Sequence, residues 1–169
     1  MVRLRKYRYE DAYSVYDWIN DPETVKYLGS GYKSPRSVDE IFERLRPFIE
    51  EELDGDCFAI ADGDSDEYLG EITLFNIDRP AKCAEIAMVL RPSLQGRGIA
   101  RAALSELIAY AFGAKGLERL YLKCFCANTR AMRLYRGAGF VTEGILRRHA
   151  YADGRVQDVA VMGLIKGEN

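Results

Sequence analysis

The chain has 169 residues, of which 48% are hydrophobic and 30% charged, a composition typical of a folded globular protein. Its 24 Lys and Arg residues nearly balance its 26 Asp and Glu residues, so the net charge of -2 gives no overall field that favours nucleic acid. No apolar run approaches the roughly 20 residues that cross a bilayer. Residues 1–5 lack the apolar core of a signal peptide, so we expect a cytoplasmic protein without nucleic-acid or membrane partners.

Cysteine and histidine usage argues against a metal site. The four cysteines contain no Cys-x-x-Cys pair, and the only histidine, His149, is far from them in the sequence. Cysteines in or beside apolar strands are more often small core residues than zinc ligands or disulfide partners. We therefore expect no bound metal and four reduced cysteines: Cys57, Cys83, Cys124 and Cys126.

The first half of the chain alternates between strand and helix patterns. The predicted elements are a strand over 2–6, a helix over 12–19, a helical turn after Asp21, a loop over 29–35, a helix over 38–49, and strands over 57–61, 68–77 and 83–90. Ser37 and Glu40 form a capping-box pattern, and Pro47 is expected to kink or divide the helix that they begin. The acidic run 62–67 is expected to be a solvated hairpin end. The loop over 29–35 fits a substrate entrance and a plain connector equally well.

A glycine-punctuated turn follows the strand that ends at Leu90. The turn reads Gln95-Gly96-Arg97-Gly98, and the next segment, from Ile99 and Ala100 onward, has apolar residues at helical spacing. Glycines leave backbone N–H groups unshielded, and a helix N-terminus adds partial positive charge. The turn is therefore a candidate phosphate or pyrophosphate site, which Arg97 and Arg101 could strengthen.

Three kinds of phosphate-binding loop compete for this turn. A Walker loop requires Gly-Lys-Ser/Thr, which is absent. A dinucleotide fingerprint requires a small third residue where Arg101 stands. The turn instead resembles the acyl-CoA loop of GNAT-type N-acetyltransferases, Gln/Arg-x-x-Gly-x-Gly/Ala, which residues 95–100 match position by position.

The rest of the chain agrees with this resemblance. A strand over 119–126 leads to a helix capped by Asn128 and Thr129, and a strand from Phe140 is followed by a hairpin that turns at Asp153-Gly154. Asn128-x-x-Ala131-x-x-Leu134-Tyr135-x-x-x-Gly139-Phe140 resembles the second motif of the same family. Further segments resemble the branch containing ribosomal-protein N-terminal acetyltransferases and spermidine acetyltransferases: Leu69-Gly70-Glu71-Ile72, Asn76-Ile77-Asp78, and Gly144 to Asp158.

The order of elements predicts one mixed α/β domain over residues 1–169, with helices on both faces of a central sheet. The resemblance implies a GNAT-like twisted mixed sheet of about seven strands. It also implies acetyl-CoA as co-substrate. The pantetheine arm would lie as an added strand against Met88, Val89 and Leu90, with Asn128 as a hydrogen-bonding partner and the 95–100 loop on the pyrophosphate.

The resemblance also implies a general acid. Tyr135 matches that residue, and a phenol, with an ordinary pKa of about 10, suits the protonation of a leaving thiolate. For the base, Glu71 and Glu85 are the candidates because both interrupt apolar strands. A plausible hairpin register places Glu71 near Val89, and Glu85 precedes the cofactor segment on its own strand, which slightly favours Glu85. The alternative for each carboxylate is a purely structural role, for instance pairing with an arginine.

The expected activity is acetyl transfer from acetyl-CoA to a primary amine. We expect a protein or peptide N-terminal amine, because α-amino groups have pKa values near 7.7–8.0 whereas alkylamines lie near 10.4. The alternatives are a polyamine such as spermidine, another small amine, or an acyl-CoA-binding module without catalysis. The sequence does not distinguish a monomer from a homodimer.

Overall fold

The computed structural model describes residues 1–28, 32, 35–50 and 56–168. The strands are β1 (Val2–Arg5), β2 (Asp56–Asp62), β3 (Tyr68–Asp78), β4 (Cys83–Leu90), β5 (Arg119–Phe125), β6 (Val141–Ala152) and β7 (Arg155–Ile165). The helices are α1 (Asp11–Ile19), α2 (Pro22–Val25), α3 (Val38–Ile49), α4 (Ile99–Phe112) and α5 (Thr129–Gly137), with a 3-10 turn, η2 (Pro92–Leu94), between β4 and α4. In the described part of the chain, no helix is long and apolar enough to cross a membrane.

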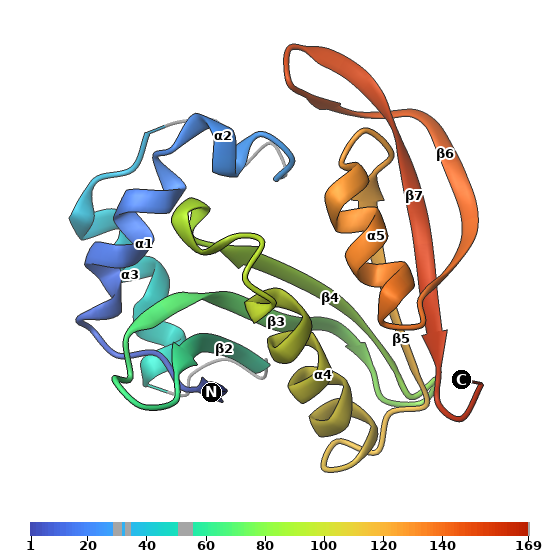
Figure 1. Ribbon diagram of the computed structural model, residues 1–169, viewed down its shortest axis with the longest axis horizontal. Coiled ribbons are helices and arrows are strands. Elements are labelled where there is room, and N and C mark those ends of the chain that lie inside the picture. Colours follow the sequence, from blue (N-terminus) through green and yellow to red (C-terminus); the bar gives the residue numbers. More distant parts are fainter. Residues whose placement is uncertain (29–31, 33–34, 51–55, 169) are drawn as a thin grey trace.

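The seven strands form one sheet in the order β1-β2-β3-β4-β5-β7-β6. All neighbouring pairs are antiparallel except β4 and β5, which are parallel. Helices α4 and α5 lie on one face of the sheet, and α1 and α3 lie on the other (Figure 1). The predicted mixed sheet with helices on both faces is therefore confirmed.

Each face of the sheet has its own core. Buried residues of α4 and α5, such as Leu104, Leu107 and Met132, pack with the strands in one cluster. Trp18 of α1 and Leu45 of α3 belong to the other cluster. Apolar side chains on both faces explain why the middle strands read as nearly continuous hydrophobic runs.

Helix starts follow the predicted capping chemistry, but two details differ from the sequence prediction. The Ser37–Glu40 capping box is present at the start of α3. Pro47 does not divide α3, which continues through the proline to Ile49. In the predicted helix over 12–19, the apolar spacing places Tyr16 on the buried side together with Val15 and Ile19, but Tyr16 is exposed and Trp18 is buried instead. Of the predicted loop over 29–35, all but Tyr32 and Pro35 lies outside the described residues.

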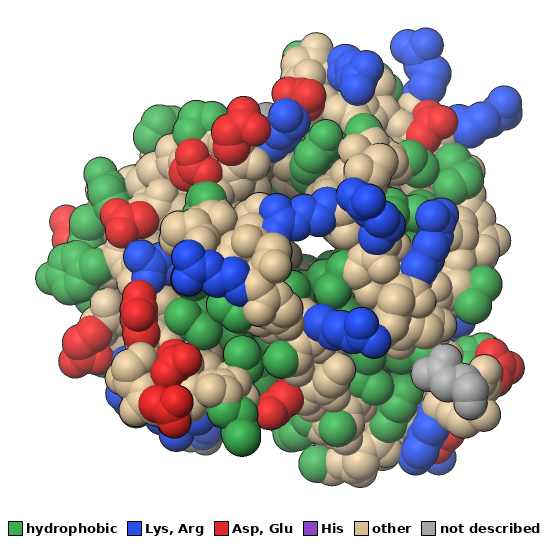
Figure 2. Space-filling model, viewed as in Figure 1, with side chains coloured by type: hydrophobic (Ala, Val, Ile, Leu, Met, Phe, Trp, Pro, Cys, Tyr) green, Lys and Arg blue, Asp and Glu red, His purple; other side chains and the backbone are tan. Residues whose placement is uncertain are grey.

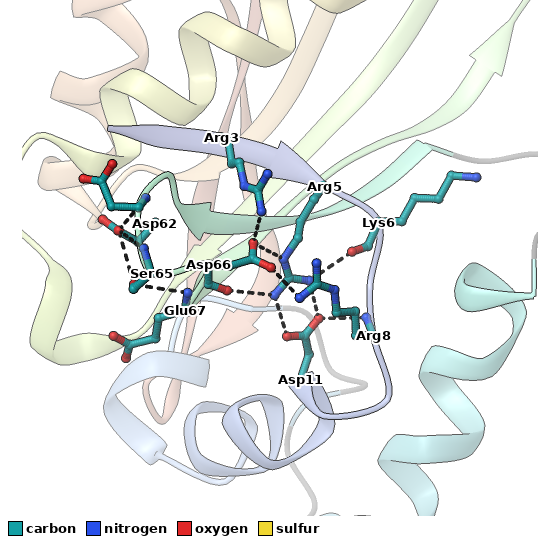
Figure 3. A network of polar contacts seen from close by, with 10 residues as sticks. Arg3, Arg5, Lys6, Arg8, Asp11, Asp62, Ser65, Asp66 and Glu67 are labelled. Atoms are coloured by element: carbon teal, nitrogen blue, oxygen red, sulfur yellow. Dashed lines mark hydrogen bonds and ion pairs between the residues drawn. The ribbon is translucent and has the colours of Figure 1, made fainter.

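The acidic turn between β2 and β3 is more than a solvated hairpin end. Arg3, Arg5 and Arg8 all form ion pairs with Asp66, whose side chain is 22% exposed. Arg5 also donates to both carboxylate oxygens of Asp11, at 2.7 and 2.8 Å (Figure 3). This cluster, called the N-terminal charge cluster below, joins β1 and the start of α1 to the β2–β3 turn.

Strands β4 and β5 separate partway along their length. Their pairing covers three residue pairs and ends at Glu85 and Tyr121. Beyond that point β4 continues to Leu90 and β5 to Phe125. Because each strand stays paired on its outer side, the sheet opens between them into a V.

Candidate functional site

A cleft of about 1050 Å³ occupies the V between β4 and β5. Residues 86–90 of β4 line one side of it, and Cys124 and Phe125 of β5 line the other. Arg91 N–H donates to Leu69 O on β3, at 3.0 Å. Because hydrogen-bonding residues alternate along an antiparallel pair, Val89 turns its peptide groups to β3, whereas Met88 and Leu90 turn theirs to the cleft.

The glycine turn lies at the open end of this cleft. Gly96 and Gly98 have φ values of +85° and +80°, and a Cβ added to either would meet open space. Gly98 is the N-cap of α4 and offers no side-chain cap, so the first N–H groups of α4, from Ile99 and Ala100, have no partner within the helix. Figure 2 shows a hollow on this side of the molecule with Lys and Arg side chains around it. Five arginines near this end of the cleft are exposed. They are Arg97 in the glycine turn, Arg101 in the first turn of α4, and Arg130, Arg133 and Arg136 in α5.

Two side chains of the predicted cofactor site, Gln95 and Asn128, differ in their contacts. Gln95 donates weakly to Leu90 O, at 3.5 Å, and accepts from Arg130 of α5. Asn128 caps α5 by accepting from Ala131 N–H at 3.1 Å. Its Oδ1 is thus occupied, and its amide nitrogen remains as a donor. Both Gln95 and Asn128 line the cleft.

Tyr135 reaches the cleft from α5. Its side chain is 8% exposed, packs edge-on against Phe140 at 5.8 Å between ring centroids, and lies near Cys124. Burial, with a smaller effect of Cys124, raises the pKa of Tyr135 well above its ordinary value of 10. The hydroxyl therefore stays protonated at neutral pH, as a proton donor must.

Glu71 is buried and held on two sides. It accepts from Tyr7 Oη at 2.6 Å and from Arg44 at 2.9 and 3.4 Å. Burial alone would lower the pKa of Arg44, but the charge of Glu71 and its hydrogen bonds raise it above the ordinary arginine value. The register Glu71–Val89 is as predicted, and Glu71 forms an ion pair with Arg44, the kind of contact expected of a structural carboxylate.

Glu85 is buried to a similar degree but has a different environment. It is 7% exposed, lines the cleft, and stands where the pairing of β4 with β5 ends. Its Oε2 accepts from Asn76 Nδ2 of β3 at 2.9 Å. No arginine contact to Glu85 is found among the described residues, in contrast to Glu71.

The cleft brings together most of the residues predicted from sequence. Tyr135, both glutamates, 88–90, Gln95 and Asn128 line it, whereas 96–101 lie beyond its lining, at the start of α4. Sequence reasoning missed Arg44 and Asn76, the partners of the two glutamates. Arg44 and Glu71 are 27 residues apart, so no local sequence pattern indicates their contact. Asn76 lies in the segment Asn76-Ile77-Asp78, which resembles the acetyltransferase branch named above.

Comparison with known proteins identifies the class. Residues 2–141 match the acetyltransferase (GNAT) domain, so the chain belongs to the GNAT acetyltransferases. It is 32% identical to an uncharacterized N-acetyltransferase, p20, of Bacillus licheniformis, covering 99% of this chain and 94% of that protein. It is 30% identical to spermidine N(1)-acetyltransferase of Vibrio cholerae, with the same coverage.

The solved structure of a relative shares the fold of this chain and contains bound ligands. Spermidine N-acetyltransferase of Vibrio cholerae, in complex with CoA and spermine, superposes with a TM-score of 0.85 at 27% identity, over 97% of this chain and 95% of that one. The protein is thus an acetyl-CoA-dependent N-acetyltransferase, and the predicted enzyme class and co-substrate are confirmed.

Proposed function

We propose that the enzyme acetylates a primary amine by direct attack of the amine on acetyl-CoA, with Glu85 as base and Tyr135 as acid. The observation that carries this proposal is the V between β4 and β5, which places both residues on one cleft of about 1050 Å³. The amine nitrogen forms a bond to the thioester carbonyl carbon. Collapse of the tetrahedral intermediate then breaks the C–S bond and releases CoA.

The cofactor is proposed to lie along β4. The N–H groups at the start of α4, from Gly98 to Arg101, bind the pyrophosphate, and the exposed arginines around the hollow neutralise its charge (Figure 2). The pantetheine arm then runs from the loop toward the closed end of the V. Its amides pair with the cleft-facing peptide groups of Met88 and Leu90, and the Asn128 amide nitrogen adds a donor.

This orientation brings the acyl end toward Glu85. Successive residues of a strand advance about 3.3 Å, so Glu85 lies on the order of 10 Å closer to the closed end than Met88 does. Glu85 accepts the amine proton, directly or through one water, and Tyr135 protonates the leaving thiolate. Glu71 is not assigned as the base, because Arg44 and Tyr7 occupy its oxygens.

For the acceptor, the relatives support a polyamine or related small amine better than a protein N-terminus. The Vibrio cholerae relative is named for spermidine, and its structure holds spermine. Aromatic rings along the cleft, such as Tyr27, Phe75 and Phe125, suit an acceptor with methylene and ammonium groups.

One observation favours the N-terminal amine as a second candidate. The described charged residues that line the cleft are Glu23, Glu71, Glu85, Lys26, Arg44, Lys123 and Arg130. Two of the carboxylates are paired, Glu23 with Lys26 and Glu71 with Arg44. A polycation would meet few free carboxylates here.

The test is a competition between spermidine and short peptides with Ser or Ala N-termini, followed by thiol release and product mass. We expect acetyl transfer to at least one of them, with the higher kcat/KM for spermidine. A clear preference for the peptides would select the second candidate. No thiol release with any amine, from protein that binds acetyl-CoA, would contradict the proposed transfer.

A further inference from the structure

A β-bulge interrupts the pairing of β3 with β4 beside Glu85. The register passes from Phe75–Glu85 to Asp78–Cys83, so two residues of β3, Asn76 and Ile77, lie opposite one residue of β4. Such bulges bend a strand and redirect a side chain, and they are frequent beside active sites.

Asn76 is the residue that this bulge redirects. In a regular strand its side chain would lie on the opposite face from Phe75 and Glu85. Instead its backbone has φ +49°, and its Nδ2 donates to Glu85 Oε2 at 2.9 Å. A positive φ is costly for most residues and is best tolerated by Gly, Asn and Asp. Among these three, only Asn supplies an amide donor.

We propose that Asn76 is a positioning residue that holds Glu85 for proton abstraction from the acceptor amine. This inference rests on the role proposed above for Glu85. The donated hydrogen bond favours the ionised carboxylate and fixes Oε2, which leaves Oε1 of Glu85 to take the proton. The bulge and the left-handed backbone of Asn76 direct its side chain toward Glu85 and so make this hydrogen bond possible.

Other titratable groups lie near Asn76 and Glu85, and they also contribute to the pH dependence of the reaction. Tyr121 lies opposite Glu85 on β5, and burial together with the charge of Glu85 raises the pKa of Tyr121. Cys83, Asp78 and Arg119 also act on Tyr121, and Lys123 lines the same cleft. None of these groups is changed by a substitution at Asn76, so a shift in the pH profile reports on the Asn76–Glu85 contact.

The first experiment separates the amide donor from the backbone conformation. Asn76→Gly keeps a residue suited to φ +49° and removes the donor, whereas Asn76→Asp keeps the shape and replaces the donor with a negative charge. We expect both variants to lower kcat by about 10- to 100-fold, the value of a hydrogen bond to a charged group. The KM for acetyl-CoA and the melting temperature should change little.

The pH profile and a matched control sharpen the result. Loss of the donor should move the low-pH limb of kcat/KM to higher pH, with the larger shift in Asn76→Asp, where two carboxylates face each other. Lys82→Gly is the control, because Lys82 also has a positive φ, +50°, in the same hairpin but makes no contact with Glu85 among those described. It should retain wild-type kinetics.

Glu85→Gln distinguishes this inference from the proposed role of Glu85. We expect Glu85→Gln to lose about 10²- to 10⁴-fold in kcat, and Asn76→Gly to add no further loss to it. Wild-type turnover in Glu85→Gln would overturn the base and, with it, the inference. If Glu85→Gln is impaired but Asn76→Gly and Asn76→Asp turn over like wild type, or if the two losses simply add, the positioning role alone is overturned.

Discussion

Burial keeps the hydroxyl of Tyr135 protonated. In water a phenol and a thiol release protons in a similar range, but the nearly complete burial of Tyr135 raises the pKa of its hydroxyl. A neutral donor therefore persists throughout the pH range in which an amine can attack. The rise also argues against Tyr135 as the base.

Replacement of Tyr135 by Phe tests this role. Only a hydroxyl is lost, and the ring contact with Phe140 at 5.8 Å can remain, so the variant should fold and bind acetyl-CoA nearly as well as wild type. Turnover should fall by about 10²- to 10⁴-fold, the usual contribution of a positioned acid. Steady-state kinetics and acetyl-CoA titration measure the two effects; wild-type turnover would assign thiolate protonation to water or another residue.

The two buried glutamates show how far sequence reasoning reaches at the residue scale. A carboxylate inside an apolar strand predicts burial, and the hairpin register predicts that Glu71 faces Val89; both are confirmed. The environments differ through partners that no local pattern reveals. Arg44 comes from a helix 27 residues away, and the Asn76 contact depends on a bulge. The sequence therefore identifies both glutamates as candidates for the base, and their tertiary contacts show that Glu71 is paired with an arginine whereas Glu85 accepts from an amide.

At the scale of elements, strand β4, the glycine turn and helix α4 form one unit. Gly98 ends the turn in a left-handed conformation and exposes the first N–H groups of α4 at the open end of the cleft. This arrangement was predictable from sequence because its signals are local: two glycines, an apolar strand before them and helical periodicity after them. The early end of the β4–β5 pairing, at Glu85 and Tyr121, carries no such signal; the family resemblance implied backbone groups available at residues 88–90 but not the point where the two strands separate.

Gly98→Val should weaken acetyl-CoA binding. The side chain would occupy the open space above the helix N-terminus and strain a backbone at φ +80°. Loss of one charge-assisted contact to phosphate corresponds to roughly a 10- to 100-fold weaker Kd. The matched control is Gly116→Val, because Gly116 also has a positive φ, +64°, and open space, but lies in the turn after α4. Calorimetric titration should show weaker binding only in Gly98→Val; equal affinities would contradict the loop assignment.

For the whole molecule, the N-terminal charge cluster ties the edge of the sheet to the first helix. Strand β1 is short and lies at the sheet edge, so its pairing with β2 alone provides limited support. Arg5 lies between Asp66 and Asp11, with its side chain 11% exposed, and links the β2–β3 turn to α1 (Figure 3). The strand, the helix and the turn are all predictable from the sequence, but the acidic pattern of the turn predicts a solvated hairpin end. The convergence of arginines on it is a tertiary feature.

Asp66→Asn should destabilise the protein at neutral pH and make its stability less sensitive to acid. The hydrogen bond from Arg3, together with the charges of Arg5 and Arg8, holds the pKa of Asp66 below its ordinary value of 3.8. A carboxyl with a lowered folded-state pKa contributes stability that is present above the ordinary value and is lost as pH falls through the folded-state value. Urea midpoints should therefore differ most at neutral pH and converge as pH falls below 3.8. Asp64→Asn, in the same turn with a side chain 94% exposed, is the control and should follow wild type throughout. A constant difference between Asp66→Asn and wild type across the whole pH range would show that the Asp66 charge does not provide this stability.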